Sequence, residues 1–504
     1  MAVNPLARAR RAMGACSAVF GMMTGVCGAV PTATPIPPPF HQFAWAESFG
    51  GQKYDTVRGI VTDRAGNVYT VGTFGAEASI STSGSALGLK SAGGEDGFVI
   101  KLASDGSSVW AHELGGKKND RATAIAMDAE SNLYIAGVYA GSSDFRPMPV
   151  GAPLTSTADS AAFLLKMDPD GNVLWARGIS SLEDSRASGV AVTPAGDVYV
   201  CGAFSGTASF EASDATKHTA GGSENAYVWA LTKDGNFRWA TTVPAASEAY
   251  AVAVDLSGFV HVAGCYTNHA DFDPSDGELP LNSVENSVDA FAWKLSGAGK
   301  FVWARSFGGP GADLAYGIAV DSQDATIITG AFSDSADFDP SPTKEFILPF
   351  RGGESDAFVC KLNSGGNLSW AQSYGSPNGF ESALAAATDR NGNIYVTGAF
   401  QDVTDFDQLQ RGGILTSNGS HDCYLVILQP NGKLNSLRRV GSVSPDSGTA
   451  VAVDTSGDVL FGGAYRQSMD ANPDAGVAYL SSTANADAFI IKLRNESALE
   501  SSHK

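Results

Sequence analysis

A tryptophan followed by alanine recurs along the chain at a nearly constant interval. The six copies stand at Trp45, Trp110, Trp175, Trp239, Trp303 and Trp370, so the intervals are 65, 65, 64, 64 and 67 residues. A seventh unit follows, with Ser436 at the tryptophan position. Self-similarity at a fixed period is the signature of repeated supersecondary units, so we expect a repeat protein and not a set of unrelated domains.

Each unit contains the same four short segments. An Ala-rich segment such as 317–321 is followed by a turn, a segment such as 393–400, a longer loop, a segment such as 356–362, and a Gly-containing turn before the next tryptophan. Alternating apolar residues in short runs bounded by turn residues predict β-strands. The 58 glycines and the charged fraction of 17% also suit short strands better than long amphipathic helices.

Two further positions are fixed within the unit. The first is a glycine with an aromatic residue two places later, at Gly72, Gly137, Gly202, Gly264, Gly330, Gly398 and Gly463, followed by Phe74, Tyr139, Phe204, Tyr266, Phe332, Phe400 and Tyr465. The second stands eight residues after the glycine, at Ile80, Phe145, Phe210, Phe272, Phe338, Phe406 and Ala471. Such regularity indicates packing positions that every unit shares.

Seven four-stranded units predict an all-β fold, a seven-bladed β-propeller with the Ala-rich strand innermost and the tryptophan strand outermost. The phase of the repeat also predicts how the ring closes. Residues 43–48 form an outer strand with no unit before it, while the last unit ends after its third strand at 487–493. We therefore expect the N-terminal strand to complete the last blade, which leaves no open sheet edge.

The repeat motifs resemble a known family. Gly-Gly-Glu-Ser-Asp-Ala-Phe-Val-Cys-Lys-Leu at 352–362 and Asp-Phe-Asp-Pro at 271–274 and 337–340 are similar to motifs of the bacterial SBBP (beta-propeller) repeat family. The resemblance extends from residue 43 to residue 497. It implies a seven-bladed propeller, but it implies no particular activity, because the family has no uniform known one.

The two ends of the chain differ from the repeats. Three arginines within residues 8–11 precede a weakly apolar stretch from 12 to 30, and a Pro-rich segment follows. We expect a signal peptide at 1–30, a linker at 31–42, the propeller at 43–497 and a disordered tail at 498–504. The expected units are 43–108, 109–172, 173–236, 237–300, 301–367, 368–433 and 434–497.

This layout predicts export, to a secreted, periplasmic or cell-surface location, without a transmembrane helix in the mature chain. A lipid anchor on Cys27 is the minor alternative, because Thr24-Gly-Val-Cys27 lacks the leucine expected of a lipoprotein box. Cys201, Cys265, Cys360 and Cys423 lie in predicted strands without CxxC spacing, so buried free thiols are expected. The formal charge of -20 argues against nucleic-acid binding, and a monomer is expected.

Paired aspartates in the long loops are candidate metal ligands. They are Asp271 and Asp273, Asp337 and Asp339, and Asp405 and Asp407. Carboxylates two residues apart in an extended segment face the same side and could bind Ca²⁺. The alternative, which we favour, is that the aspartates cap turns while the phenylalanine between them packs into the core.

A second acidic pattern precedes each innermost strand. The residues are Asp55, Asp120, Asp184, Glu248, Asp313, Glu381 and Asp446. They would form an acidic rim around the axis, or each would accept backbone N–H groups within its own loop, which is the interpretation we favour. Aspartates at the start of the third strands, at Asp96, Asp289, Asp356 and Asp487, are interpreted as outer-edge charges.

No catalytic constellation is apparent. The seven histidines share no repeat phase, and His261, at a position that is otherwise usually tyrosine, is interpreted as a packed aromatic substitute. The sequence contains no GxSxG elbow or phosphate-binding loop. We interpret the chain as a binding or scaffold module whose ligand, a protein or a glycan, binds the acidic long-loop face. The alternative is a carboxylate-based hydrolase or lyase that acts on glycans at the same face.

Overall fold

The computed structural model describes residues 41–81, 87–145, 153–211, 217–273, 275, 280–407, 412–482 and 485–496. Their regular structure is β, apart from one 3₁₀ turn at Val284–Asn286, so the all-β prediction is confirmed. The expected signal peptide at 1–30, most of the linker at 31–42 and the tail at 498–504 lie outside the described residues. Strand β1 (His41–Gly51) includes the last two residues that we assigned to the linker.

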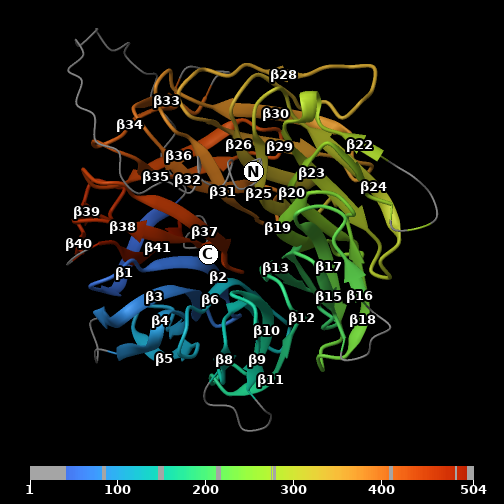
Figure 1. Ribbon diagram of the computed structural model, residues 1–504. Coiled ribbons are helices and arrows are strands. Elements are labelled where there is room, and N and C mark those ends of the chain that lie inside the picture. The colour runs from blue at the N-terminus through green and yellow to red at the C-terminus, as the bar shows by residue number, and fades with distance from the viewer. Residues whose placement is uncertain are drawn as a thin grey trace, which may run out of the picture.

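Five four-stranded antiparallel sheets repeat along the chain, each with its strands in sequence order. They are β6 (Arg121–Met127), β7 (Leu133–Tyr139), β10 (Ala161–Met167) and β11 (Val173–Gly178); β13 (Ser185–Val192), β14 (Val198–Phe204), β17 (Asn225–Leu231) and β18 (Phe237–Thr242); β19 (Ser247–Val254), β20 (Val260–Thr267), β23 (Val288–Leu295) and β24 (Phe301–Phe307); β25 (Asp313–Val320), β26 (Thr326–Phe332), β29 (Asp356–Leu362) and β30 (Leu368–Tyr374); and β31 (Ser382–Thr388), β32 (Ile394–Phe400), β35 (Asp422–Leu428) and β36 (Leu434–Val440). The first strands gather at the centre of the molecule, whereas tryptophan-bearing strands such as β11, β18 and β24 lie toward the outside (Figure 1).

The two ends of the described chain meet in a sixth, eight-stranded sheet. Its strands are β37 (Ser447–Val453), β38 (Val459–Tyr465), β41 (Asp487–Asn495), β1, β3 (Val68–Ser81), β4 (Leu87–Leu102) and β5 (Ser108–Leu114), with β2 (Thr56–Thr62) on β3. Strand β1 pairs antiparallel with β41, from His41 opposite Asn495 to Phe49 opposite Ala488. These strands lie side by side in Figure 1, one blue and one red.

The first and last units share this sheet, whereas the sequence predicts separate four-stranded units. The end of β1 also pairs with β3, from Ser48 opposite Ser81 to Gly51 opposite Ala78. This second pairing exists because β3 and β4, with 14 and 16 residues, extend beyond the length of their counterparts.

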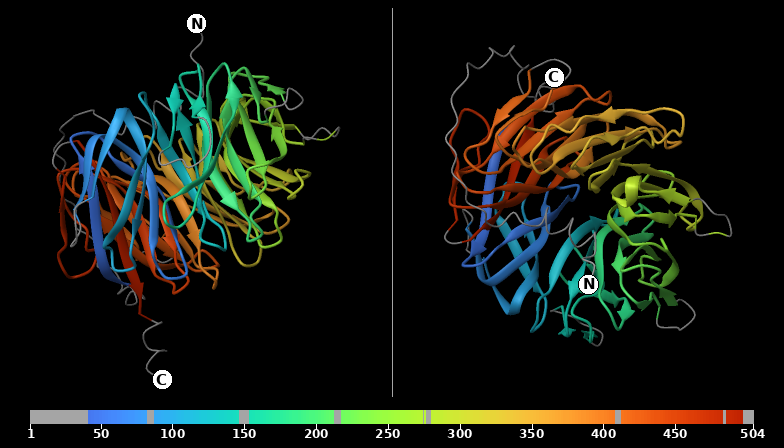
Figure 2. Two further views of the ribbon diagram at one scale, coloured as in Figure 1. Left: turned by 90° about the horizontal axis from the view of Figure 1, so that it is seen from below. Right: turned by 45° about the horizontal axis from the view of Figure 1, so that its top comes forward.

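Most segments that the sequence presents as long loops contain a small hairpin, visible at the periphery in Figure 2. The pairs are β8 (Ser142–Ser143) with β9 (Leu154–Thr155), β15 (Thr207–Ser209) with β16 (Lys217–Thr219), β21 (His269–Asp271) with β22 (Pro280–Asn282), β27 (Ala336–Asp337) with β28 (Ile347–Leu348), β33 (Val403–Asp405) with β34 (Ile414–Thr416), and β39 (Ser468–Asp470) with β40 (Tyr479–Ser481). One further short strand, β12 (Ser180–Ser181), pairs with β15. The residue eight places after the periodic glycine, such as Phe272 or Phe338, is buried in the core of every unit, as its fixed position in the repeat predicts.

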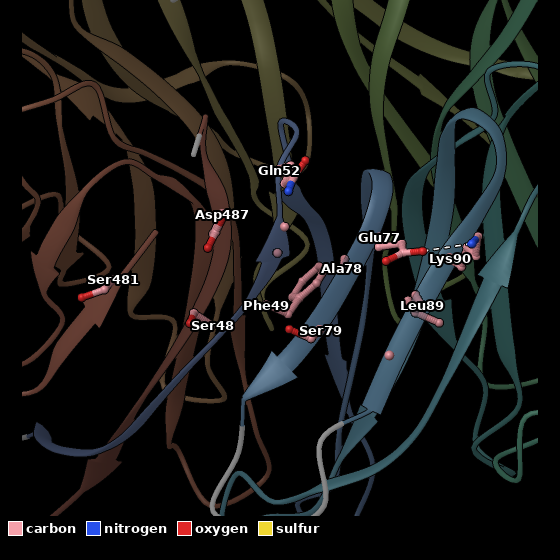
Figure 3. A pocket seen from close by; sticks show the side chains of 13 residues that line it. Ser48, Phe49, Gln52, Glu77, Ala78, Ser79, Leu89, Lys90, Ser481 and Asp487 are labelled. Atoms are coloured by element: carbon pink, nitrogen blue, oxygen red, sulfur yellow. Dashed lines mark hydrogen bonds and ion pairs between the residues drawn. The ribbon is translucent and has the colours of Figure 1, made fainter. Parts of the chain in front are cut away.

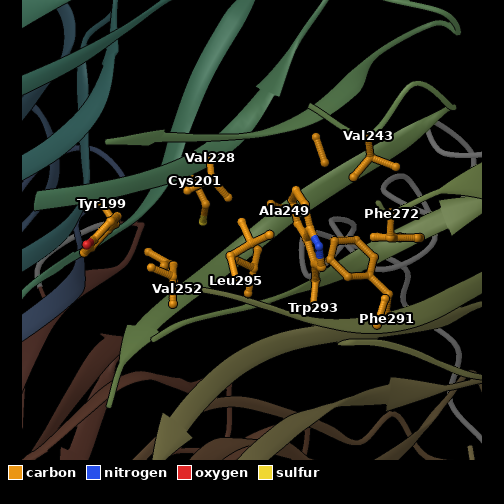
Figure 4. Packing of buried hydrophobic residues seen from close by; sticks show 14 of the residues in the cluster. Tyr199, Cys201, Val228, Val243, Ala249, Val252, Phe272, Phe291, Trp293 and Leu295 are labelled. Carbon is orange, nitrogen blue, oxygen red and sulfur yellow. The ribbon is translucent and has the colours of Figure 1, made fainter. Parts of the chain in front are cut away.

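The hydrophobic core lies between neighbouring sheets. In one cluster, Cys201 and Val228 from one sheet pack with Val252, Phe291 and Trp293 from the next (Figure 4). The sheets therefore stabilise one another face to face, and no unit has a complete core of its own.

The periodic tryptophans join consecutive sheets. The indole N–H of Trp239 donates to the carbonyl of Gly297 in the next sheet at 3.1 Å, and that of Trp303 donates to the carbonyl of Ser364 at 3.1 Å. The indole also covers a turn glycine: a Cβ built on Gly299, whose φ is +76°, would lie 2.8 Å from Trp239. Each tryptophan thus fixes the turn between the third and fourth strands of the following sheet.

The missing seventh tryptophan has a structural reason. The sheet that follows β36 has no turn between its third and fourth strands, because these are β41 and β1, from opposite ends of the chain. Ser436 is therefore buried without a turn to cover. Tyr395 packs edge-on against His41 at 6.0 Å, where Tyr134 in an earlier sheet packs against Trp175 at 6.0 Å.

A β-bulge interrupts every first strand at the same position. The bulged residues are Arg58, Thr123, Ser188, Tyr250, Tyr316, Leu384 and Thr449. Each bulge lies opposite the periodic glycine of the second strand. A Cβ built on Gly330 would lie 1.9 Å from the carbonyl oxygen of Leu314, and one on Gly398 would lie 1.8 Å from that of Ser382. The backbone approach at the bulge therefore requires glycine.

Replacing Gly330 by alanine should destabilise the protein by about 3 kcal/mol, because the new methyl group would overlap backbone that cannot move aside. Gly88→Ala is the matched control: it lies in strand β4, where an added Cβ meets nothing within 4 Å. Its effect should stay within about 0.5 kcal/mol. Urea unfolding of both variants measures the difference, and equal stabilities would contradict the requirement for glycine.

Candidate functional site

The aspartate pairs of the outer hairpins cap turns. One carboxylate oxygen of Asp271 accepts the backbone N–H of Asp273 at 3.0 Å, and Asp337 accepts that of Asp339 at 2.9 Å. Asp405 accepts the backbone N–H of Asp407 at 2.9 Å in the same way. The capping role that we favour from the sequence is therefore confirmed.

The second aspartates also cap. Asp273 accepts the N–H and the hydroxyl of Ser275 at 2.9 and 2.7 Å, and Asp339 accepts the N–H of Ser341 at 3.0 Å. Across the described part of the chain, no group of three or more His, Cys, Asp or Glu side chains is placed to hold a metal ion. Calcium binding by these hairpins stays a prediction.

Calcium binding has a direct test. A few millimolar Ca²⁺ should raise the melting temperature, because a ligand of the folded state stabilises it by mass action. Asparagine at positions 271, 273, 337 and 339 keeps a capping oxygen but removes the charge that calcium needs, so this variant should lose the response. Scanning calorimetry with Ca²⁺ and with Mg²⁺ measures it, and a calcium-independent melting temperature in the parent would leave the aspartates as turn caps alone.

The acids that precede the innermost strands do not form an exposed rim. Asp55 is buried and accepts the N–H groups of Gly51 and Gly75, at 2.9 and 3.0 Å. Asp313 is also buried and accepts the N–H of Gly309 at 2.9 Å. Asp120, Glu381 and Asp446 are buried and bound to loop N–H groups in the same way. For these five, the capping interpretation is confirmed and the rim hypothesis is wrong.

Two members of that pattern occupy other positions. Strand pairing places Ser185 opposite Phe204 and Ser247 opposite Tyr266, as it places Asp313 opposite Phe332. Serines therefore stand where the other units have a buried acid. Asp184 is exposed and accepts the N–H of Ser160 at 3.0 Å, whereas Glu248, one residue farther into its strand, pairs with Arg186.

Pairs of buried carboxylates lie where consecutive units meet. The aspartates at the starts of third strands, which we interpreted as outer-edge charges, are buried, so that interpretation is wrong. Burial raises the pKa of Asp356 to about 7 and that of Glu381 to about 8, and the negative charge of Asp356 adds to the rise at Glu381. Equivalent pairs are Asp487 with Asp55, Asp96 with Asp120, Asp289 with Asp313, and Asp422 with Asp446.

These carboxylates should make stability fall as the pH rises. Their pKa values in the folded chain, about 7 for Asp356 and about 8 for Glu381, exceed the ordinary values of 3.8 and 4.5. The folded chain therefore holds more protons than the unfolded chain between about pH 4 and about pH 8, and the free energy of unfolding decreases across that window. Buried histidines with lowered pKa, such as His261, act in the opposite sense below their ordinary pKa of 6.5.

The variant Asp356→Asn isolates the carboxylate contribution, because asparagine resembles the protonated acid. It should reduce the fall in melting temperature between pH 5.5 and pH 8 by about 2 °C or more. Asn225 and Ser247 form a natural neutral version of such a pair. Asp234→Asn, at an exposed turn, is the control and should leave the pH profile unchanged. Thermal melts at several pH values check this, and identical profiles for both variants would contradict it.

The bulged residues of the first strands line one cavity of about 310 Å³ at the centre of the molecule. The backbone repeats in all seven strands, but the side chains differ: one guanidinium, two phenols, three aliphatic hydroxyls and one leucine. Sequence analysis missed this set, because the bulge position carries no repeated residue. The position could have been found by its variability. In every unit, the bulged residue stands two places after the residue whose carbonyl approaches the periodic glycine.

Charged and aromatic side chains are unevenly placed around this cavity. Arg186 pairs with Glu224 at 2.6 Å and with Glu248 at 2.9 Å. Because these side chains are largely buried, the three form a tightly bound ionic cluster. Tyr250 and Tyr316 lie beside each other with ring centroids 5.6 Å apart. The hydroxyl of Tyr250 lies 3.3 Å from the sulfur of Cys265.

A second hollow, of about 680 Å³, lies where β1 passes between β41 and β3 (Figure 3). Its wall is formed largely by backbone and small side chains, with Phe49 and Leu89 as the apolar members. Glu77 and Lys90 lie across from each other and pair at 2.9 Å. The charges of Glu77 and Lys90 offset each other, and Gln52 and Asp487 also line this hollow.

His261 replaces a tyrosine in both packing and hydrogen bonding. Its Nε2 lies 3.0 Å from Asp255, as the hydroxyl of Tyr134 lies 3.2 Å from Asp128. Its ring packs against Trp303 at 6.2 Å. The interpretation as a packed aromatic substitute is confirmed. Cys201, Cys265, Cys360 and Cys423 are free and buried, as expected.

Comparison with known proteins gives one repeat family and two relatives of low identity. The family model described as Beta-propeller repeat matches residues 40–73. An uncharacterized WD repeat-containing protein of Acanthamoeba polyphaga mimivirus is 22% identical over 436 residues, which cover 71% of this chain and 31% of the relative. The regulatory protein FlaEY of Caulobacter vibrioides is 23% identical over 363 residues, covering 68% and 36%. The chain thus spans about a third of the length of these relatives.

Solved structures with similar folds include WD40 proteins. The WD40 domain of Neurospora crassa Pan2 is 6% identical, with a TM-score of 0.41 and coverage of 86% of this chain and 88% of that one. The WD40 repeats of RRP9 are 10% identical, with a TM-score of 0.44 and coverage of 90% and 100%.

Proposed function

We propose that this chain is a binding or scaffold module, a closed seven-bladed β-propeller that holds its ligand at the axis, near the long-loop face. Closure is supported by the pairing of β1 with β41. It is also supported by the contacts of the first strands, each of which packs against the next, with β2 packing against both β6 and β37. In this arrangement the eight-stranded sheet contributes two blades that share β1 as a bridge.

The observation that carries the proposal is the set of seven bulges. Bulges re-aim side chains, and here the seven bulged residues, which are of five types, line one shared cavity on an otherwise repeated backbone. A rigid scaffold with variable residues at one place is the usual design of a recognition site. The bulged residues stand near the beginning of the first strands. The site therefore lies close to the loops that enter each unit.

Binding is favoured over carboxylate-based glycan cleavage. Glu224 and Glu248 both pair with Arg186, so these carboxylates are held in an ionic cluster. The carboxylates with raised pKa values, such as Glu381, lie between sheets and accept hydrogen bonds from loop groups. Neither group supplies the pair of a proton donor and an available base that glycoside hydrolysis uses. We propose no catalytic residue.

The surroundings of the module are part of the proposal. The three arginines and the apolar stretch within residues 8–30 support export to a secreted, periplasmic or cell-surface location, with a lipid anchor on Cys27 as the alternative. No helix among the described residues is long and apolar enough to cross a bilayer. We propose a monomer that binds a protein or a glycan and no nucleic acid.

The double variant Tyr250→Ala, Tyr316→Ala should lose at least about tenfold in affinity for whichever member of a defined panel of glycans and peptides binds the parent. Tyr479→Ala, at an exposed site on an outer hairpin, should bind as the parent does. Biolayer interferometry measures affinity, and a reducing-end assay measures cleavage. A binder unaffected by the double variant would contradict the axial site, and release of reducing ends would favour the enzyme.

A further inference from the structure

We propose that the central cavity binds a sugar acid, a single pyranose ring that carries one carboxylate. Arg58 would hold the carboxylate, and Tyr250 and Tyr316 would hold the ring. This assignment rests on the proposed axial binding function and names the class of ligand. Three features of the cavity support it: an arginine without a carboxylate partner, an aromatic platform across from it, and hydroxyl groups between the two.

Arg58 differs from the other arginines of the innermost strands. Arg121 pairs with Glu95 at 2.6 Å, and Arg186 pairs with Glu224 and Glu248. Within the described residues, no carboxylate pairs with Arg58, although it lines the cavity of a chain whose formal charge is -20. A guanidinium offers a planar fork of donors that matches a carboxylate, so this position favours an anionic group from outside the chain.

The aromatic platform lies across the cavity from Arg58. Arg58 lies in β2, Tyr250 in β19 and Tyr316 in β25. Around the ring of first strands, β6 and β13 lie between Arg58 and Tyr250, and β37 and β31 lie between Arg58 and Tyr316. The two phenol rings lie at 44° to each other and are half-buried, so they present fixed faces. Aromatic faces of this kind pack well against the C–H groups of a sugar ring.

Hydroxyl-bearing residues connect the two ends of the cavity. Thr123 donates its hydroxyl hydrogen to the carbonyl of Ala187 at 2.6 Å, and Thr449 donates to the carbonyl of Val57. A threonine hydroxyl that donates in this way keeps its oxygen lone pairs for a donor such as a sugar hydroxyl. Ser188 adds a further hydroxyl on the side of Thr123. The volume of 310 Å³ is at the lower end of ligand pockets, about 300 Å³, which suits one ring and not an extended chain.

Calorimetric titration of the full chain with D-glucuronate, D-glucose and acetate tests each element separately. Glucuronate should bind with one site per chain. Glucose lacks the carboxylate and acetate lacks the ring, so each should bind at least about tenfold more weakly, the loss expected for a charge-assisted hydrogen-bonded contact. Arg58→Gln should reduce glucuronate binding to the level of glucose. Arg64→Gln, an exposed arginine in the turn after the first strand, is the matched control and should bind as the parent does.

Several outcomes would overturn the assignment. Acetate that binds as well as glucuronate would make Arg58 a simple anion site, and an Arg58→Gln variant that binds glucuronate as the parent does would exclude the proposed contact. A peptide whose C-terminal carboxylate binds through Arg58, without glucuronate binding, would assign the site to a protein partner. Thermal melts of every variant show whether a loss of binding reflects unfolding.

The result also separates this inference from the proposed function. If glucuronate fails while binding to another panel member still depends on Tyr250 and Tyr316, the axial binding function holds and the sugar acid is wrong. If no binding depends on these tyrosines, both proposals are wrong.

Discussion

The close approach of two backbone segments underlies the repeated structure. In each unit the first strand bulges, and the carbonyl oxygen just before the bulge lies where a Cβ would project from the second strand. Glycine at that position permits the contact, and the bulge then directs one side chain toward the centre. The glycine is thus a condition for this arrangement, because any side chain there would overlap the carbonyl oxygen of the first strand.

The periodic residues of the sequence predicted the scaffold well. Trp239 and its counterparts marked outer strands because each indole makes the same hydrogen bond to the next sheet. Gly330 marked a second strand because the equivalent carbonyl approaches the glycine in each unit. A residue type that recurs at the same position of every unit therefore indicates a contact that recurs in every unit. Ser436, the exception, reflects a sheet whose outer turn is missing.

The candidate site was invisible for the same reason. Arg58, Tyr250 and Leu384 occupy equivalent positions but share no chemistry, so no search for repeated residues finds them. A one-residue offset also misled the alignment of acids: Glu248 resembled Asp313 in the sequence, yet strand pairing gives that place to Ser247. Register in a β-sheet decides which face a residue occupies, and a single-residue slip reverses it.

The acidic composition also has a different meaning in the folded chain. Many carboxylates are internal caps whose pKa is raised by burial, such as Asp55 and Asp422, both to about 7. Near neutral pH a share of them is protonated, so the folded chain carries less negative charge than its formal value of -20.

Strand β1 is synthesised before the other strands but finds its main partner last. Its pairing with β41 joins His41 to Asn495, so almost the whole described chain must be made before the hydrogen bonds can form. Contacts between such distant residues form slowly, because the intervening chain must first be ordered. Until then the growing array has two unpaired sheet edges, which can pair with other chains. The last step, the pairing of β1 with β41, is therefore the step most exposed to aggregation. Its rate depends on how quickly residues 41–51 meet a strand roughly 440 positions away along the chain.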